Sequence, residues 1–195
     1  MRYRTFFGRS CVVIRILQEA SRWVLSLAVS FVLALLICTY IIQPTKVSGH
    51  SMEPTLANSE RLFILKWTHT FSITPNYGDI VVIDSRVDRV RTFKDELLDN
   101  PFFNFVTHQS DQEIFYIKRV IGKPGDTLEF KNHHVYRNGE ELNEPYLKET
   151  MLYTSEQSYT VPEDHIFVMG DNRNHSKDSR EIGFIPLSHV LGKKL

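Results

Sequence analysis

An uncharged apolar run of twenty residues, Trp23 to Ile42, limits what this chain can fold into more than any other feature. As a helix it would be roughly 30 Å long at about 1.5 Å per residue, which matches the hydrocarbon thickness of a bilayer. Trp23 and Tyr40 lie near its ends, where amphipathic rings favour the membrane interface. Pro44 follows and disfavours further helix. The run predicts one transmembrane helix rather than a buried core helix or a cleaved signal peptide.

Charge is unevenly distributed along the chain. The first 22 residues carry five arginines and one glutamate, a net charge of +4, and the remainder carries −4, so the 195 residues sum to zero. Basic residues before a transmembrane helix mark its cytoplasmic side. We therefore expect a single-pass protein of the cell membrane with a cytoplasmic N-terminus (1–22), a transmembrane helix (23–42) and an extracytoplasmic domain (43–195). The acidic remainder argues against nucleic acid as a partner.

The basic stretch before the apolar run holds a second, weaker pattern. Phe6 to Ala20 mixes apolar residues with Arg9 and Arg15, which is compatible with a short interfacial helix.

After Pro44 the pattern changes to short apolar runs rich in β-branched and aromatic residues, separated by turn signals such as Tyr77-Gly78-Asp79. Two arms, Thr127–Phe130 and His134–Tyr136, are typical of a hairpin, and Asn138-Gly139 is a second tight-turn signal. This pattern predicts a mainly β fold, a folded antiparallel sheet or barrel-like domain. The expected buried strands are Leu62–Leu65, Ile80–Ile83, Ile114–Ile117 and Ile166–Met169.

One stretch, Arg86 to Gln112, does not fit the β pattern. It is polar and charged, and we interpret it as an insertion of about 86–112 between two strands. The simplest interpretation is a solvated loop. Its apolar patch of Phe102, Phe103, Phe105 and Val106 is also compatible with a membrane-dipping or substrate-guiding role.

Ser51 is a candidate nucleophile that needs a partner to take its proton. His50 is adjacent, and neighbouring side chains on an extended chain point to opposite faces. For His133, His134, His175 and His189, no aspartate lies at a spacing that would orient the ring, so a surface or packing role is expected. Both cysteines lie before residue 43, and no His-x-x-x-His pair occurs, so no metal site or cofactor is expected.

Lys118 is the alternative partner for Ser51. It lies inside an apolar run, on the strand face shared with Tyr116 and Val120. A buried lysine loses solvation, which lowers its pKa and favours the neutral amine that can act as a general base. On the pattern alone, a surface lysine on a half-buried strand remains the alternative.

Four stretches, taken together and in order, resemble the motif boxes of type I signal peptidases. They are Ser-Gly-His-Ser-Met-Glu-Pro-Thr (48–55), Tyr-Gly-Asp-Ile-Val-Val (77–82), Tyr-Ile-Lys-Arg-Val-Ile-Gly-Lys-Pro-Gly-Asp (116–126) and Gly-Asp-Asn-Arg-Asn-His-Ser-Lys-Asp-Ser-Arg (170–180). The similarity runs from about residue 20 to the C-terminus. The family's large second domain would fall between the last two boxes, where only the 39 residues 131–169 lie, as in the short forms of Gram-positive bacteria.

The resemblance implies roles for individual residues. Ser51 corresponds to the nucleophile, Lys118 to the general base and the Ser51 backbone N–H to an oxyanion donor. In some members a serine two residues before the nucleophile is a second oxyanion donor, but here that position is Gly49, so a backbone N–H or Ser48 would have to serve. Supporting roles fall on Tyr116 and Ser176, which place the lysine, and on the ion pairs Arg119–Asp171 and Asp178–Arg180.

The expected function is therefore that of a membrane-anchored serine endopeptidase that removes signal peptides from secretory preproteins without a cofactor. Its partners would be preproteins with small residues one and three positions before the cut, the lipid bilayer and the protein-export machinery. Ser51 is nine residues beyond Ile42, so an extended link reaches about 30 Å and keeps the site near the membrane surface. The alternatives are a Ser-Lys peptidase dedicated to one secretion, pilus or conjugation substrate, and an inactive membrane-tethered scaffold.

Overall fold

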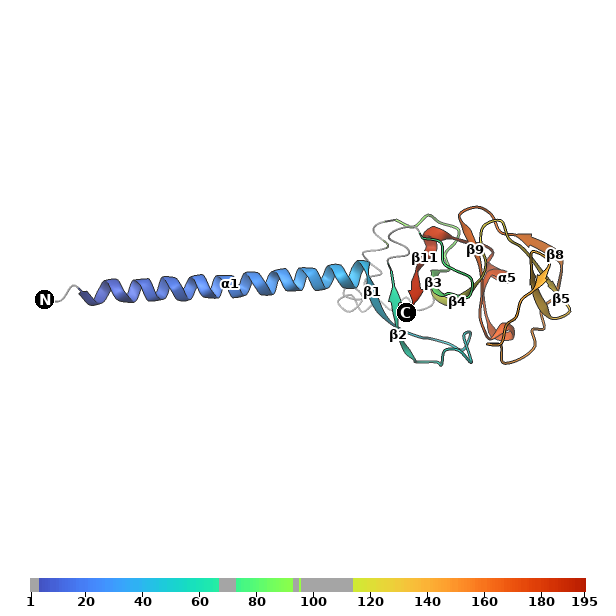
Figure 1. The fold of residues 1–195 in the computed structure, drawn as a ribbon, viewed down its shortest axis with the longest axis horizontal. Coiled ribbons are helices and arrows are strands. Elements are labelled where there is room, and N and C mark those ends of the chain that lie inside the picture. Colours follow the sequence, from blue (N-terminus) through green and yellow to red (C-terminus); the bar gives the residue numbers. More distant parts are fainter. Residues whose placement is uncertain (1–3, 67–72, 93–94, 96–113) are drawn as a thin grey trace. The chain divides into compact units, whose positions relative to one another are not determined.

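The chain divides into two compact units, Met1–Thr39 and Tyr40–Leu195, here called the helical unit and the β unit (Figure 1). The computed structural model describes residues 4–66, 73–92, 95 and 114–195. Residues 96–112 of the predicted insertion, including its phenylalanine patch, lie outside the described residues.

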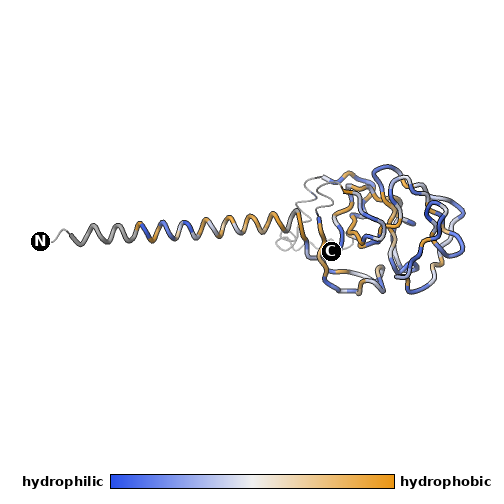
Figure 2. The backbone as a smooth tube through the Cα atoms, viewed as in Figure 1, coloured by the Kyte–Doolittle hydropathy of each residue, from blue (hydrophilic) through white to orange (hydrophobic). Residues whose placement is uncertain are grey.

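The helical unit is formed by α1, which spans Arg4–Tyr40. No Pro or Gly interrupts the chain between Ala20 and Trp23, and Arg22 there forms an exposed ion pair with Glu19. The basic stretch at Phe6–Ala20 is therefore part of the same helix rather than a separate one. Within α1, Ile14–Ile37 is long and apolar enough to cross a membrane, and Figure 2 shows hydrophobic residues concentrated in its second half.

The described part of the β unit contains two antiparallel sheets, with strand orders β1-β2-β11-β3-β4-β9-β10 and β7-β6-β5-β8. The expected strands Leu62–Leu65, Ile80–Ile83 and Ile166–Met169 are confirmed, while the fourth begins one residue later, at Phe115, and is longer. The strands are β1 (Ile42–Lys46), β2 (Arg61–Leu65), β3 (Ile80–Asp84), β4 (Phe115–Gly122), β5 (Thr127–Lys131), β6 (His134–Arg137), β7 (Glu140–Glu141), β8 (Ser155–Thr160), β9 (His165–Met169), β10 (Ile185–Pro186) and β11 (Val190–Lys194).

Strand β4 lies in the interior of the larger sheet and carries the candidate base. It pairs antiparallel with β3 on one side, where Lys118 is opposite Val81, and with β9 on the other, where Arg119 is opposite Met169. Both edges of β4 are hydrogen-bonded to neighbouring strands, and its side chains project alternately to the two faces of the sheet. The interior position fixes Lys118 between neighbouring strands.

The smaller sheet is built on the predicted hairpin. Strand β5 runs one residue further than expected, to Lys131, and pairs with β6 through a turn in which Asn132 and His133 have φ of 52° and 66°. Asn138 and Gly139, at φ of 56° and 85°, form the second tight turn. Such positive φ values suit the turns that join twisted antiparallel strands, so both turn predictions are confirmed.

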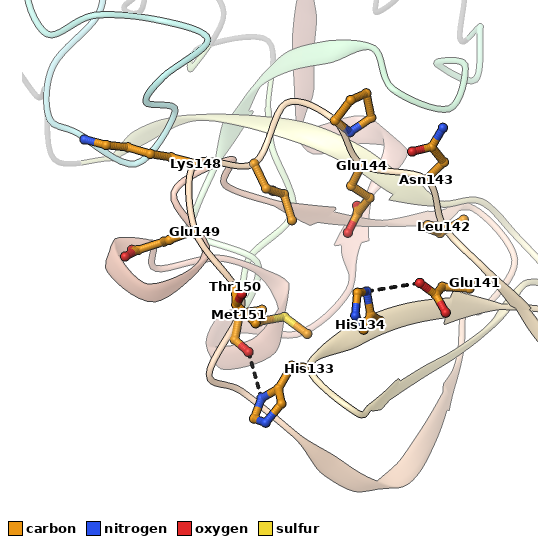
Figure 3. A pocket seen from close by; sticks show the side chains of 12 residues that line it. His133, His134, Glu141, Leu142, Asn143, Glu144, Lys148, Glu149, Thr150 and Met151 are labelled. Atoms are coloured by element: carbon orange, nitrogen blue, oxygen red, sulfur yellow. Dashed lines mark hydrogen bonds and ion pairs between the residues drawn. The ribbon is translucent and has the colours of Figure 1, made fainter.

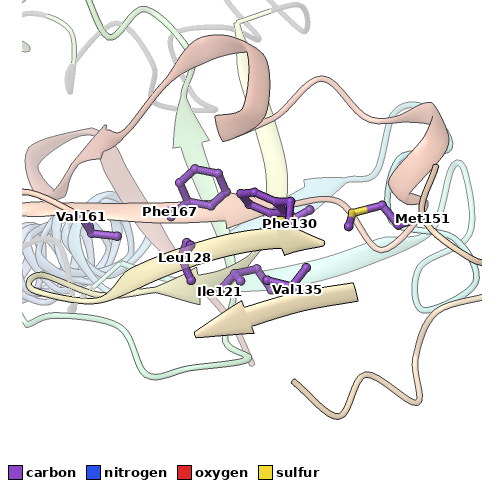
Figure 4. Packing of buried hydrophobic residues seen from close by; sticks show 8 residues of the cluster. Ile121, Leu128, Phe130, Val135, Met151, Val161 and Phe167 are labelled. Atoms are coloured by element: carbon purple, nitrogen blue, oxygen red, sulfur yellow. The ribbon is translucent and has the colours of Figure 1, made fainter. Parts of the chain in front are cut away.

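Three clusters of buried apolar side chains form the core of the β unit. One links the two sheets through Ile121, Leu128, Phe130 and Phe167, with Phe130 packed edge-on against a tyrosine ring at 5.3 Å between centroids (Figure 4). A second includes Val81, Val120 and Val168, and a third packs Met52 and Leu56, which follow Ser51, against residues of the larger sheet. The mainly β prediction is confirmed, and burial of Met52 anchors the segment that contains Ser51.

Candidate functional site

The Ser51 segment joins β1 to β2 and is tied down at both ends. Val47 donates its backbone N–H to Glu60 O at 2.8 Å and accepts from Ser59 N at 2.9 Å, which closes the segment into a loop. Leu56 N donates to Met52 O at 2.9 Å, and both of these side chains are buried. The apolar residues that follow the serine thus hold its backbone rigidly against the core.

Lys118 and Ser51 meet although 67 positions separate them in the chain. Lys118 Nζ lies 2.8 Å from Ser51 Oγ and donates to Ile117 O at 3.0 Å. The lysine is only 3% exposed, and its Nζ lies 5.3 Å from the centroid of the Tyr116 ring. The amine is therefore within proton-transfer distance of the hydroxyl, and Tyr116 lies beside it.

The environment of Lys118 lowers its pKa to about 8, from an ordinary value of 10.5. Burial is the largest cause, because removing the ammonium from water disfavours the charged form. The carboxylates of Asp178 and Asp171 act in the opposite direction, and the Arg180 guanidinium adds to the lowering. A lysine with this pKa supplies a neutral amine near physiological pH.

The loop after β9 holds the carboxylates that surround the lysine. The Asp171 carboxylate accepts hydrogen bonds from Arg119 Nε at 2.8 Å and from an Arg119 terminal nitrogen at 2.6 Å. The Asp178 carboxylate accepts two hydrogen bonds from Arg180 in the same way, each at 2.8 Å. Burial alone would raise the pKa of Asp178, but the Arg180 guanidinium keeps it below its usual value. Both expected pairs are thus formed in the structure, on either side of the loop.

Ser176 lies in the same loop but does not make the expected contact. Its buried Oγ makes no geometrically defined hydrogen bond within the described part of the chain and instead lies near Asp178, where it helps to lower the pKa of that carboxyl, whereas Lys118 Nζ donates to Ser51 Oγ and Ile117 O. A Cβ placed on Gly170 would collide with the Ser176 hydroxyl, so this hydroxyl is packed against the Gly170 backbone instead. The Ser176–Lys118 hydrogen bond is therefore absent in this arrangement.

Three of the histidines considered in the sequence, His50, His133 and His134, contact groups other than Ser51. His50 Nδ1 is 2.7 Å from Glu53 Oε1 and its side chain is exposed, in a segment of bends and turns rather than the extended chain that the alternation argument assumed. His133 and His134 line a pocket of about 540 Å³, where they contact Met151 O at 3.0 Å and Glu141 Oε1 at 3.1 Å (Figure 3). Within the described ranges, no group of three or more His, Cys, Asp or Glu side chains is placed to hold a metal ion.

Two further residues, Glu144 and Tyr146, contact arginines of the motif stretches and were not predicted. Arg173 is buried and forms a two-point ion pair with Glu144, and Tyr146 stacks on the Arg119 guanidinium at 4.0 Å. In sequence, Glu144 and Tyr146 lie in a short polar segment with no periodicity. Nothing local distinguishes them from surface residues, because their partners are 29 and 27 positions away.

Comparison with known proteins decides the family. The family model described as "Signal peptidase, peptidase S26" matches residues 20–195. The chain belongs to the signal peptidase family, peptidase S26. It is 35% identical to signal peptidase I P of Bacillus subtilis subsp. natto over 183 residues, covering 87% of this chain and 84% of the relative.

A second curated relative agrees with the assignment, and one solved structure is also similar. Signal peptidase I of Bacillus licheniformis is 36% identical over 180 residues, covering 87% of this chain and 83% of that protein. A signal peptidase I from Enterococcus faecalis V583, seen in a crystal structure, is 28% identical with a TM-score of 0.41, covering 62% of this chain and 96% of the other. The sequence matches identify the chain as a serine endopeptidase of the signal peptidase I type, which cleaves signal peptides.

Proposed function

We propose that Ser51 is the nucleophile and Lys118 the general base with which this chain cleaves preproteins. The observation that carries the proposal is the 2.8 Å contact between Lys118 Nζ and Ser51 Oγ at a lysine that is 3% exposed. With a pKa of about 8, about a tenth of the enzyme holds the neutral amine at pH 7 and about half at pH 8. The base is thus available under ordinary conditions.

The reaction proceeds in two stages at this pair. The Ser51 hydroxyl donates its proton to neutral Nζ as Oγ bonds to the scissile carbonyl carbon. The resulting ammonium gives that proton to the leaving amine as the C–N bond breaks, which leaves an acyl-enzyme ester. A water molecule then loses a proton to Nζ and attacks the ester, and Ser51 recovers its proton when the carboxylic acid product departs.

The oxyanion of both stages needs hydrogen-bond donors, and we assign the Ser51 backbone N–H as one of them. Gly49, two residues earlier, offers no side-chain donor, and its N–H donates to Asn58 Oδ1 at 3.1 Å. The Gly49 N–H is therefore engaged within the loop. A second donor would come from Ser48 or from another backbone N–H.

Supporting roles fall on the residues around the lysine. Tyr116 limits the space beside Nζ, and the pairs Arg119–Asp171 and Asp178–Arg180 fix the loop that follows β9. Ser176 has a buried hydroxyl that is near Asp178 and makes no geometrically defined hydrogen bond among the described residues, which suits a group that engages Nζ during proton transfer. This role requires a shift of Ser176 from its present position.

The helical unit points to membrane anchoring, and we propose an orientation for it. The five arginines of the first 22 residues favour a cytoplasmic N-terminus and a β unit outside, where secretory preproteins emerge. The proposed partners are thus preproteins, the lipid bilayer and the protein-export machinery. No cofactor takes part in the proposed steps.

Cleavage of a secretory preprotein by the detergent-solubilised full chain tests the dyad. Wild type should cut at the signal-peptide junction, and Ser51→Ala and Lys118→Ala should each lose at least about 1,000-fold in kcat/KM while retaining the wild-type circular dichroism. Lys131→Ala, a surface lysine on β5, is the matched control and should keep full activity. Near-normal rates for Lys118→Ala would return the base role to a histidine. Failure of wild type on general preproteins would favour a peptidase dedicated to one substrate.

A further inference from the structure

Glu144 makes a buried ion pair with an arginine of the loop after β9, and Glu144 itself lies outside every motif stretch. Arg173 donates to its two carboxylate oxygens at 2.6 and 2.7 Å. The side chains are 1% exposed for Arg173 and 7% for Glu144. Arg173 Nε also donates to Gly170 O at 3.1 Å. The guanidinium therefore joins Glu144 to the backbone of the loop.

Tyr146, two residues later, connects the same carboxylate to strand β4. Its hydroxyl donates to Glu144 Oε1 at 2.7 Å, and its ring lies 4.0 Å from the Arg119 guanidinium carbon. Burial and the negative charge of Glu144 raise the pKa of Tyr146, so the phenol stays protonated and keeps its role as donor. Arg119 follows Lys118 directly on β4, so the segment 144–146 contacts both the base-bearing strand and the loop after β9.

That loop in turn holds the nucleophile. Asn172, next to Arg173, donates its backbone N–H to Ser51 O at 3.0 Å and its side-chain amide to His50 O at 3.2 Å. The position of Ser51 thus depends on where Asn172 lies, and Asn172 is flanked by Asp171 and Arg173, each of which is held by a two-point ion pair. A continuous series of contacts links Lys118 to Ser51 through segment 144–146.

A buried ion pair contributes little net stability, because the attraction largely offsets the desolvation of both groups. A two-point ion pair instead fixes geometry, because two parallel N–H···O bonds set both the distance and the relative plane of the guanidinium and the carboxylate. A shift of about 1 Å between reacting groups can reduce a rate by about 100-fold. The contacts of Glu144 and Tyr146 are therefore better suited to setting a distance than to holding the fold together.

We propose that Glu144 and Tyr146 are positioning residues that set the distance between Lys118 and Ser51. The inference rests on the proposed Ser51–Lys118 dyad. Neither residue touches the reacting atoms, and both act through Arg173 and Arg119. Glu144 also lines the pocket of about 540 Å³ (Figure 3), and its carboxylate forms an ion pair with Arg173.

Separate measurement of kcat and KM tests this role. The full chain in detergent is assayed on one preprotein, about 20 °C below the lowest melting temperature of the set, and kcat is expressed per folded molecule. Glu144→Gln should lower kcat about 10- to 100-fold with KM changed less than about twofold. Arg173→Lys should lower kcat to a similar extent, because lysine keeps the positive charge but lacks the two parallel N–H donors of the guanidinium. Tyr146→Phe keeps the ring on Arg119 and should lower kcat about 3- to 10-fold.

Glu141→Gln is the matched control. This glutamate is half exposed and lies three residues before Glu144, so its replacement should leave kcat unchanged. If Glu144→Gln and Tyr146→Phe both keep the wild-type kcat per folded molecule, the proposal is wrong and the two residues have only a structural role. If Glu144→Gln does not fold, Tyr146→Phe alone decides. Ser51→Ala is run alongside: residual activity there would contradict the dyad itself, which is a different failure.

Discussion

Lys118 is the residue on which the site depends, and its burial works against folding. Its amine is buried, and no carboxylate of the described residues is in direct contact with it, because Asp178 is paired with Arg180 and Asp171 with Arg119. The pKa in the folded chain is about 8, below the 10.5 of an exposed lysine. Below pH 8 the amine is charged in both the folded and unfolded states, and the folded state bears the full desolvation penalty. As pH rises from 8 to 10.5, only the unfolded chain keeps the proton, and the penalty disappears.

Replacement of Lys118 by methionine should therefore stabilise the protein at neutral pH while abolishing cleavage. A shift from 10.5 to about 8 corresponds to about 3 kcal/mol, and the lost contacts to Ser51 and Ile117 reduce the expected gain to about 2 kcal/mol. Denaturant unfolding of wild type and Lys118→Met at pH 7 and pH 10.5 measures it. The advantage of the variant should shrink at the higher pH. A variant less stable than wild type at pH 7, or a difference independent of pH, would contradict the burial argument.

At the scale of elements, the loop after β9 is packed closely against the segment that contains Ser51. A Cβ on Gly170 would lie 2.5 Å from Ser51 O and would also collide with Ser176. Gly170 cannot retreat, because its N–H donates to Asp178 at 2.9 Å and its carbonyl accepts from Arg173. The close approach that brings Asn172 to Ser51 requires a residue without a side chain.

Gly170→Ala should thus displace Ser51 relative to Lys118, with a loss of kcat/KM of at least about 100-fold and a destabilisation of about 1–3 kcal/mol. Gly122→Ala is the matched control. Its Cβ would meet Leu128 Cδ1 at 2.9 Å in the apolar core rather than Ser51. It should destabilise comparably and keep kcat per folded molecule. Near-normal activity of folded Gly170→Ala would show that the two segments can separate without effect.

Much of the fold could be predicted from local patterns, because apolar runs mark β2, β3, β4 and β9 and paired turn residues mark the hairpin β5–β6. Strand β8, with the polar sequence Ser-Glu-Gln-Ser-Tyr-Thr, and the terminal β11 carry little such signal. Their placement depends on long-range pairing, such as that of β11 between β2 and β3. Periodicity cannot register such pairing.

Part of the candidate site could likewise be predicted from the sequence, and part could not. Ser51 and Lys118 were found through motif resemblance and the buried character of one strand, not through any rule that joins residues 67 positions apart. The ion pairs of Asp171 and Asp178 came from the same motifs. Glu144 and Tyr146 were missed because only the folded chain brings them to Arg173 and Arg119. The expected Ser176–Lys118 bond failed because Ser176 packs against Gly170.

For the whole molecule, the division into a helical unit and a β unit separates anchoring from chemistry. The proposed nucleophile, base and supporting residues all belong to Tyr40–Leu195, and the apolar stretch Ile14–Ile37 belongs to the other unit. A membrane anchor raises the effective concentration of enzyme at its substrate without a new contact. Removal of the anchor should therefore change the encounter with substrate rather than the catalytic step.

Deletion of residues 1–39 should leave kcat/KM on a short soluble signal-junction peptide within about twofold of the full chain. Cleavage of a preprotein embedded in vesicles should fall at least about 100-fold, because the second binding event is no longer intramolecular. Both rates are measured in parallel at equal enzyme concentration. Equal losses on the two substrates would show that the helical unit is needed for the fold or the chemistry of the β unit.

The pH dependence of kcat/KM for the full chain tests the central claim, a buried neutral Lys118 as the base, most directly. On a substrate without titrating groups near the cut, kcat/KM should rise with pH and reach half its maximum near pH 8, the pKa of Lys118 in the free enzyme. The residual rate of Lys118→Ala should lack this step. A midpoint below about pH 7, as for an ordinary histidine, or the same step in Lys118→Ala, would contradict the account.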